Sequence, residues 1–182
     1  MYVKTQKEQY MVTMTRRQLI DLGLVLAQAD HIFKQPITGR FYYAATKNRT
    51  IAQDEYKITQ EAYPESQEIA KYDQRRIALI NEVGETIKEG FSNLPVTERD
   101  AIINSPALTP EKKDGLMAKI SELDEEFKDA LEEFRKTDAQ RNEFLAESIE
   151  VDLKTVKPEE VPEIVDGDGW KIYSILDPMI KE

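Results

Sequence analysis

The clearest structural signal in the chain lies in residues 110–153, which read PEKKDGLMAKISELDEEFKDALEEFRKTDAQRNEFLAESIEVDL. Thr109, Pro110 and Glu111 form a helix-start signal, because they combine a cap residue, a proline at the first helical position and an acid. The apolar residues that follow recur mostly at steps of three and four, close to a heptad pattern. They are Leu116, Ile120, Leu123, Phe127, Leu131 (or Ala130), Phe134 and Phe144. This apolar stripe predicts one long helix over residues 110–148, with Leu123 and Phe127 in the core.

The period of the apolar pattern changes directly after that helix. Ile149, Val151 and Leu153 alternate with Glu150 and Asp152, and a period of two is typical of a strand with one buried face. We therefore expect a strand here, with the three apolar side chains toward the core and the two acids toward water.

Three further helices are predicted upstream of the long one. Thr15 and Gln18 have the spacing of a capping box, and they open a helix of about four turns. A second helix is expected over residues 40–62 and a third over about 65–89, with Pro64 between them, because proline ends one helix and is accepted in the first turn of the next. The apolar and aromatic residues of the second helix that we place on one face are Tyr42, Ala45, Ala52, Tyr56 and Tyr63. Ala44, Ile51 and Ile58 lie on the opposite side, so this helix could be covered on more than one side.

These elements predict a mainly α fold: a bundle of three or four helices, with a long helix in the C-terminal half and a small β element. Met11–Met14 is a second strand candidate and could pair with residues 149–153. We expect a single helical domain over residues 1–182, in which residues 149–182 could form a small β and turn subdomain.

The composition excludes many enzyme classes. The 182 residues include no cysteine and a single histidine, His31, which removes disulfides, thiolate nucleophiles and the common cysteine and histidine metal sites. No phosphate-loop, dinucleotide-binding or zinc-protease pattern occurs. The acidic turn Asp166–Gly169 lacks the ligand spacing of a calcium loop. We expect no catalytic residue, no cofactor and no metal, and a structural role for His31.

Membrane and export signals are also missing from the sequence. It has no apolar run near 18 residues, so we expect no membrane span. Residues 1–10 lack an apolar core of the kind that secretory signals have, so we expect no such signal there.

The net charge of −10 is unevenly distributed. Residues 1–60 hold nine Lys/Arg against five Asp/Glu, a balance of +4, whereas residues 61–182 hold sixteen against thirty, a balance of −14. Such asymmetry is found where a surface binds a charged partner, and equally where helices are simply solvated. Both interpretations stay open at this point.

Two groups of charged residues are candidate binding surfaces. Arg40, Tyr43 and Lys47 share one helical face, where cations beside an aromatic ring could meet phosphates and stack a base, or contact a protein. Pairing with the acidic helices inside the fold is the other interpretation of this group. The second group is an acidic surface off the apolar stripe, made of Glu125, Glu126, Glu132 and Glu133. These four carboxylates lack the pocket that acid–base chemistry needs, so we interpret them as solvated.

Several blocks of the sequence resemble an uncharacterised family of small phage and prophage proteins. The blocks are Arg16–Ile20, Phe41–Asn48, Glu125–Phe144, Glu147–Leu153 and Leu176–Ile180, and the likeness extends over nearly the whole chain. None of them is a catalytic signature. The resemblance implies a viral origin and supplies no mechanism.

The functional expectation is a phage-encoded, non-enzymatic protein that acts by binding another macromolecule, in virion or tail assembly. Its partner would be a phage or host protein, and direct nucleic-acid binding is not expected. The stripe from Leu116 to Phe144 could support self-association, although packing within the chain explains it equally well. The alternative is a host-directed inhibitor of a defence system, whose acidic surface replaces the phosphates of a nucleic acid. We expect the protein in the host cytoplasm or in the virion.

Overall fold

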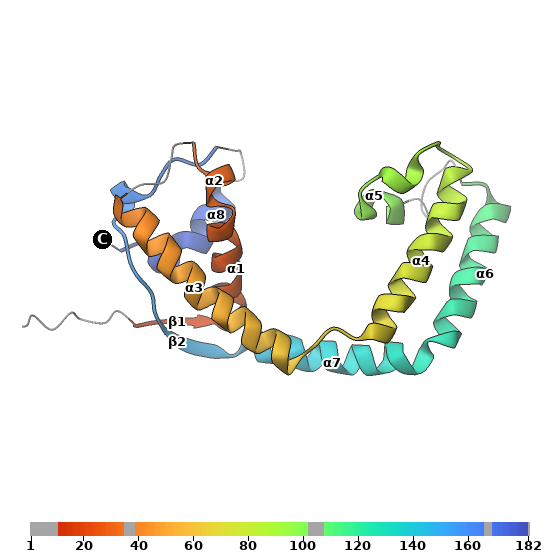
Figure 1. Cartoon of the computed structure of the whole chain (residues 1–182), viewed down its shortest axis with the longest axis horizontal. Helices are drawn as coiled ribbons and strands as arrows, with labels where there is room; N and C mark the ends of the chain where they lie inside the picture. Colours follow the sequence, from red (N-terminus) through yellow and green to blue (C-terminus); the bar gives the residue numbers. More distant parts are fainter. Residues whose placement is uncertain (1–10, 35–38, 102–107, 166–168, 182) are drawn as a thin grey trace, which may run out of the picture. The chain divides into compact units, whose positions relative to one another are not determined.

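The computed structural model describes residues 11–34, 39–101, 108–165 and 169–181. These residues are mainly helical and include one two-stranded antiparallel sheet, which confirms the predicted fold class (Figure 1). By its internal packing the chain divides into two compact units: unit 1 is Met1–Tyr63 with Gln140–Glu182, and unit 2 is Pro64–Ala139. This division does not test the expectation of one domain over residues 1–182 with a subdomain at 149–182, which stays a prediction.

The sheet of unit 1 is formed by β1 (Met11–Thr15) and β2 (Ser148–Asp152), so both predicted strands and their pairing are confirmed. Val151 and Leu153 are buried, and Ile149 is half-buried against the same core. Of the two acids, Glu150 is exposed and Asp152 is half-exposed. The alternation in the sequence therefore places the strand faces correctly.

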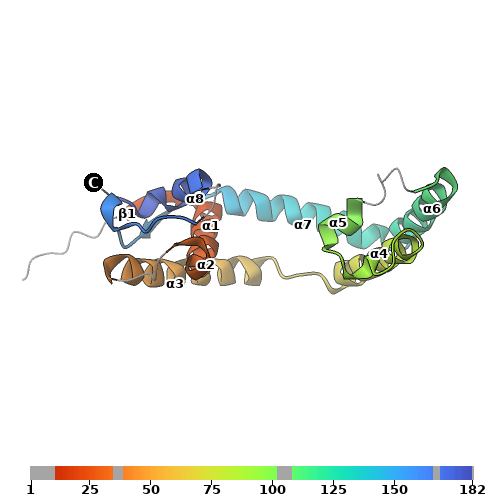
Figure 2. The same cartoon turned by 90° about the horizontal axis from the view of Figure 1, so that it is seen from above.

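Helix α1 (Arg16–Ala27) begins at the predicted capping box. The Thr15 hydroxyl accepts a hydrogen bond from the Gln18 N–H, and the Thr15 N–H donates to the Gln18 side chain at 2.8 Å. The helix is packed between α3 (Gly39–Ala62) and α8 (Gly169–Leu176), as Figure 2 shows from above. A Cβ on Gly23 would overlap the Ala52 side chain, so glycine permits the close crossing of α1 and α3.

The buried face of α3 agrees with the predicted stripe at Ala45 and Ala52 and differs from it at the tyrosines. Tyr42 and Tyr56 are 60% and 43% exposed, so the prediction that they belong to a buried stripe is wrong. The buried positions are instead Phe41, Ala44, Ala45, Asn48, Ala52 and Thr59. Alanine at position 52 fits this face because α1 approaches closely at Gly23, and Tyr42 and Tyr56 point toward solvent.

The C-terminal part of the chain completes unit 1 by packing against α1 and the segment that follows α1. After α1 come the short helix α2 (Ala29–Ile32) and Phe33, which forms a β-bridge with Ile164. The C-terminal part of unit 1 also contains two 3-10 turns, η3 (Pro158–Glu160) and η4 (Asp177–Met179). Val156 forms a parallel β-bridge with Ile180. The core so formed includes Met14, Leu19, Leu22, Leu26, Phe33, Phe41, Val151, Leu153, Leu176 and Met179.

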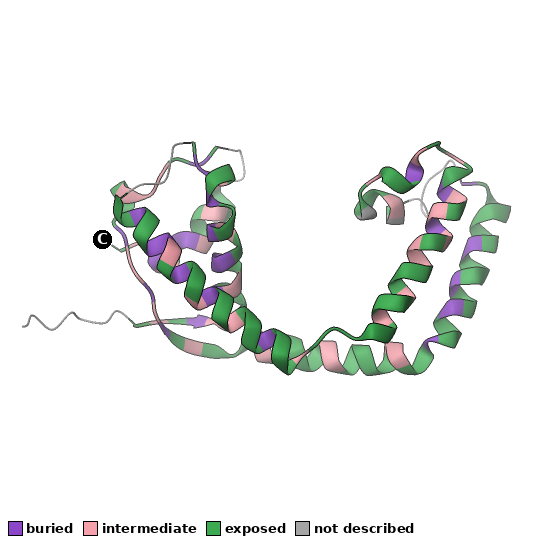
Figure 3. Ribbon diagram, viewed as in Figure 1, coloured by how far each residue is buried: buried purple, intermediate pink, exposed green. Residues whose placement is uncertain are grey.

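Unit 2 is built on α4 (Gln67–Glu85) packed against α6 (Pro110–Glu126), with η1 (Phe91–Asn93) and α5 (Val96–Asp100) between them in the chain. Its buried side chains include Ile80, Phe91, Leu116, Ile120 and Leu123. Figure 3 draws the buried positions of α4 and α6 in purple. Each unit therefore has apolar residues of its own to bury.

The single long helix predicted over residues 110–148 is wrong. The chain forms α6 and then α7 (Lys128–Ala146), with Phe127 between them at φ −103° and ψ 16°. Phe127 itself is buried, as predicted, and its ring lies 5.8 Å from that of Tyr72 and 5.4 Å from the Arg75 guanidinium, both on α4. Neither proline nor glycine marks this break, and the contacts with α4 accompany it. Beyond the break, Phe134 is 45% exposed and leaves the predicted stripe.

Candidate functional site

An open groove of about 650 Å³ lies in unit 1 between β2, the start of α1 and the middle of α3. Its floor is apolar, because Leu19 and Val151 are buried there and Ile51 and Ile149 are half-buried. The polar residues around this floor are Arg16, Lys47, Thr50, Glu55, Glu150, Asp152 and Lys154. An apolar floor with a charged rim is the usual composition of a binding site for a protein segment.

Arg16 lies at one end of the groove and is held by several partners. Its guanidinium forms ion pairs with Glu55 and Glu147, the latter at 3.3 Å, and lies 4.1 Å from the centre of the Phe144 ring. Burial of this group opposes the charged form, but the hydrogen bonds that the guanidinium donates to the two carboxylates, together with their charge, outweigh it and raise the pKa of Arg16. This cation is thus already satisfied within the fold.

Asn48 of α3 binds Lys154, which is one of the residues that line the groove. Its side chain is fully buried, its Nδ2 donates to the Lys154 carbonyl at 2.9 Å, and its Oδ1 accepts from the Lys154 N–H at 2.8 Å. One side chain on α3 therefore binds both backbone groups of a residue just beyond β2. The sequence analysis missed this role, and the only signal for it was a polar residue among the apolar positions 41, 44, 45 and 52.

The basic face predicted from the sequence lies beside this groove. Lys47 lines it, and the Lys47 ammonium lies 5.9 Å from the centre of the Tyr43 ring, which is 56% exposed. Arg40 lies one turn before Tyr43, with its side chain 79% exposed and a 3.7 Å ion pair to Glu160. All three side chains are at the surface, and Arg40 has a partner within the fold. Their role in binding stays a prediction.

The four carboxylates of the predicted acidic surface have two different kinds of surroundings in unit 2. Glu125 and Glu132 line a depression of about 320 Å³ together with Lys128 and Arg135, and Glu133 is exposed nearby on α7. Glu126 is instead paired with Arg75, with the Nη2–Oε2 distance at 2.8 Å, and this hydrogen bond lowers the pKa of the Glu126 carboxyl. Glu126 therefore joins α6 to α4, while the other three carboxylates are interleaved with cations.

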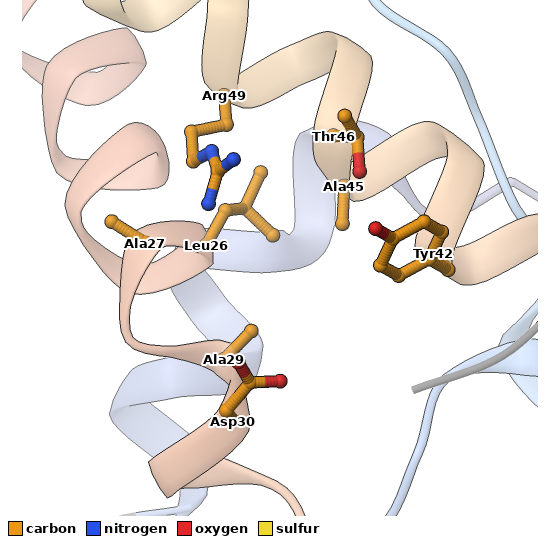
Figure 4. Close-up of a pocket in the computed structure, with 8 residues that line it drawn as sticks. All are labelled: Leu26, Ala27, Ala29, Asp30, Tyr42, Ala45, Thr46 and Arg49. Carbon is orange, nitrogen blue, oxygen red and sulfur yellow. The ribbon is translucent and has the colours of Figure 1, made fainter. Parts of the chain in front are cut away.

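A smaller pocket of about 130 Å³ lies between the end of α1, α2 and α3 (Figure 4). Tyr42, Arg49 and Asp30 bring polar atoms to its wall, as the sticks in Figure 4 show. Binding sites for small molecules usually start at about 300 Å³, so this pocket is too small for most ligands. We do not assign a function to it.

The described residues offer no cluster of three or more metal-ligating side chains. His31 is exposed on α2, and the acidic turn at residues 166–168 lies outside the described residues. Among the helices of the described ranges, none combines the length and apolar character that a bilayer span requires.

Comparison of the chain with family models, with curated proteins and with solved structures gave no match. The comparisons therefore add no support to the resemblance to phage proteins, which stays a prediction.

Proposed function

We propose that this protein is a non-enzymatic binding protein that holds a protein partner in the groove between β2 and α3. The observation that carries the proposal is the groove itself, with the apolar floor of Leu19, Ile51, Ile149 and Val151 beside the exposed cation Lys47. Burial of such a floor is the main favourable term in protein association.

Assembly of a phage particle is the role we propose for this binding. It follows from the resemblance of the sequence to phage proteins, and a mostly apolar groove is compatible with it because assembly contacts are long-lived and largely apolar. The partner would then be another component of the particle.

Inhibition of a host defence system is the second candidate role, and the charge of unit 2 favours it. Residues 64–139 hold eleven Lys/Arg against eighteen Asp/Glu, a balance of −7. Glu125, Glu132 and Glu133 are exposed there and could meet a basic groove. However, Lys128 and Arg135 interrupt the array, whereas a phosphate backbone is negative throughout.

Photo-cross-linking in the native cellular context tests the proposed function. A benzophenone amino acid replaces Thr50, which is exposed in the groove, and in a control it replaces Lys57, which is exposed on the same helix outside the groove lining. We expect discrete protein adducts from position 50 that disappear when Lys47→Glu is added, and none of them from position 57. Nucleic-acid adducts, or equal adducts from both positions, would overturn the proposal.

The identity of the adducts then separates the two roles. Structural components of a particle support assembly. A host enzyme that acts on nucleic acid, cross-linked from positions 125 or 132 rather than from position 50, supports inhibition and contradicts assembly.

A further inference from the structure

The hydrogen-bond pattern of the sheet identifies a free edge on β2. The Arg16 N–H donates to the Glu147 carbonyl at 3.1 Å, and Thr15 lies opposite Ser148 in the register. In an antiparallel ladder, residues alternate between pairs that exchange both hydrogen bonds and pairs that exchange none. Met14–Ile149 and Val12–Val151 are therefore the bonded pairs. It follows that Ser148, Glu150 and Asp152 direct their backbone N–H and C=O groups away from β1.

No other part of the described chain pairs with this edge. Within the described ranges, the backbone N–H and C=O of Glu150 have no hydrogen-bond partner outside the sheet. Two positions beyond the strand, the N–H and C=O of Lys154 are bound by Asn48 of α3. The chain on that side of β2 thus lies toward α3, and the edge opens into the groove that Ile149–Asp152 and α3 line together.

An unpaired strand edge beside an apolar groove is the arrangement that binds an extended peptide. The backbone of the peptide adds to the sheet, and its alternate side chains enter the groove. The charges on the rim add a requirement for the peptide. Arg16 is paired with Glu55 and Glu147, and Lys154 is paired with Asp152 at 2.8 Å. Lys47 has no carboxylate partner among the described residues, so it favours an acidic side chain in the occupant.

A second copy of β2 fits this edge poorly. When two β2 strands pair antiparallel, the outward-directed residues lie opposite one another. In the register that pairs all five residues of both strands, Glu150 faces Glu150 of the other copy, and like charges in directly opposed positions destabilise a sheet. A different polypeptide avoids this repulsion.

We infer that β2 accepts an extended segment of a protein partner as the third strand of the sheet, with alternating apolar side chains toward the groove floor and an acidic side chain at Lys47. This inference rests on the proposed function and specifies the form of the partner. The Asn48 carboxamide occupies the edge position at Lys154, so it ends the added strand there.

A pair of proline variants tests strand addition. Glu150→Pro removes an N–H that points to the free edge of β2 and costs no hydrogen bond to β1. Thr13→Pro is the matched control, because Thr13 lies directly opposite Glu150 and its N–H points to the other edge of the same sheet. The probe is a library of random linear twelve-residue peptides, selected on the whole protein. Selected peptides are then titrated against both variants and against Lys47→Glu.

We expect the selected peptides to alternate apolar residues and to carry an acid. We expect Glu150→Pro to weaken their binding about tenfold or more, because one hydrogen bond is lost and the added strand clashes with the proline ring. Thr13→Pro should leave binding within about twofold, since its edge is not used. Unfolding by urea checks that both variants are equally folded. Hydrogen exchange should show the Glu150 and Asp152 amides protected by the peptide.

Three results would overturn strand addition. They are equal effects of the two proline variants, no protection of the Glu150 and Asp152 amides, and a helical conformation of the bound peptide. If position 50 still gives protein adducts, these results leave the proposed function intact. Absence of those adducts together with absence of selected peptides would overturn both.

Discussion

The carboxamide of Asn48 is completely buried, yet its oxygen and its nitrogen both have partners. A buried amide is stable only when its polar atoms are satisfied, and here a single backbone position, Lys154, satisfies both. The contact also fixes the segment after β2 against α3. One residue therefore holds Lys154, which lines the groove, against α3.

Replacement of Asn48 should be costly for this reason. Asn48→Ala leaves the Lys154 N–H and C=O without their partners, and we expect the free energy of unfolding to fall by about 1–3 kcal/mol. Urea unfolding followed by circular dichroism measures this value. Thr50→Ala, an exposed position on the same helix, is the control, and a loss for Asn48→Ala no larger than that of the control would contradict the prediction.

Helix ends in this chain are set partly by local and partly by distant contacts. The start of α1 at Thr15, the start of α6 after Thr109 and the change of period at Ile149 depend on neighbouring residues, so the sequence was sufficient to predict them. The break at Phe127 is accompanied by contacts with Tyr72 and Arg75 of α4, which are more than fifty positions away. No helix-breaking residue marks it, and a periodic pattern alone cannot show it.

Phe127 should contribute to the stability of unit 2 through these contacts. Because its ring is buried against α4, we expect Phe127→Ala to lower the free energy of unfolding by about 3–5 kcal/mol. Phe134→Ala is the matched control, since the same ring is 45% exposed on α7 and should cost far less. Chemical denaturation of both variants provides the comparison, and a shift below about 1 kcal/mol for Phe127→Ala would show that the ring is not a core residue.

The site was less predictable than the fold for the same physical reason. Arg40, Tyr43 and Lys47 could be placed on one surface because they share a helix, where spacing determines the face. The groove beside them requires β2, which is distant in the sequence, and its free edge follows from the register rather than from any motif. Glu126 was grouped with Glu125 from the local sequence pattern, although its ion-pair partner is Arg75 of another helix.

At the scale of the whole molecule, the negative charge is concentrated in unit 2. Of the net −10, residues 64–139 carry −7, and the remaining −3 belongs to residues 1–63 and 140–182. Long-range attraction to a basic partner would therefore act through unit 2, while the groove of unit 1 offers apolar contact. The two proposed roles thus use different units.

Salt dependence separates the two roles. We expect binding of the cross-linked partner to change little between about 50 and about 200 mM salt, because the groove contacts are mainly apolar. Reversing Glu125, Glu132 and Glu133 to lysine should also have little effect, and Glu126 is left in place because it joins α6 to α4. Binding that falls steeply with salt and is lost in this triple variant would favour the inhibitor role instead. The measurement is partner recovery at both salt levels.

The insertion of unit 2 between the two segments of unit 1 also determines the order in which the protein can mature on the ribosome. β1 can pair with β2 only after β2 has been synthesised, and the contact between Arg16 and Glu147 beside the sheet joins residues 131 positions apart. All of unit 2 leaves the ribosome during that interval and already contains the apolar residues of its own core. Until then Met14, Leu19 and Leu22 lack the cover that the last segment brings, and exposed apolar surface of this kind recruits chaperones or leads to aggregation. The groove needs β2 as well as α1 and α3, so a nascent chain cannot capture its partner there before β2 has been synthesised.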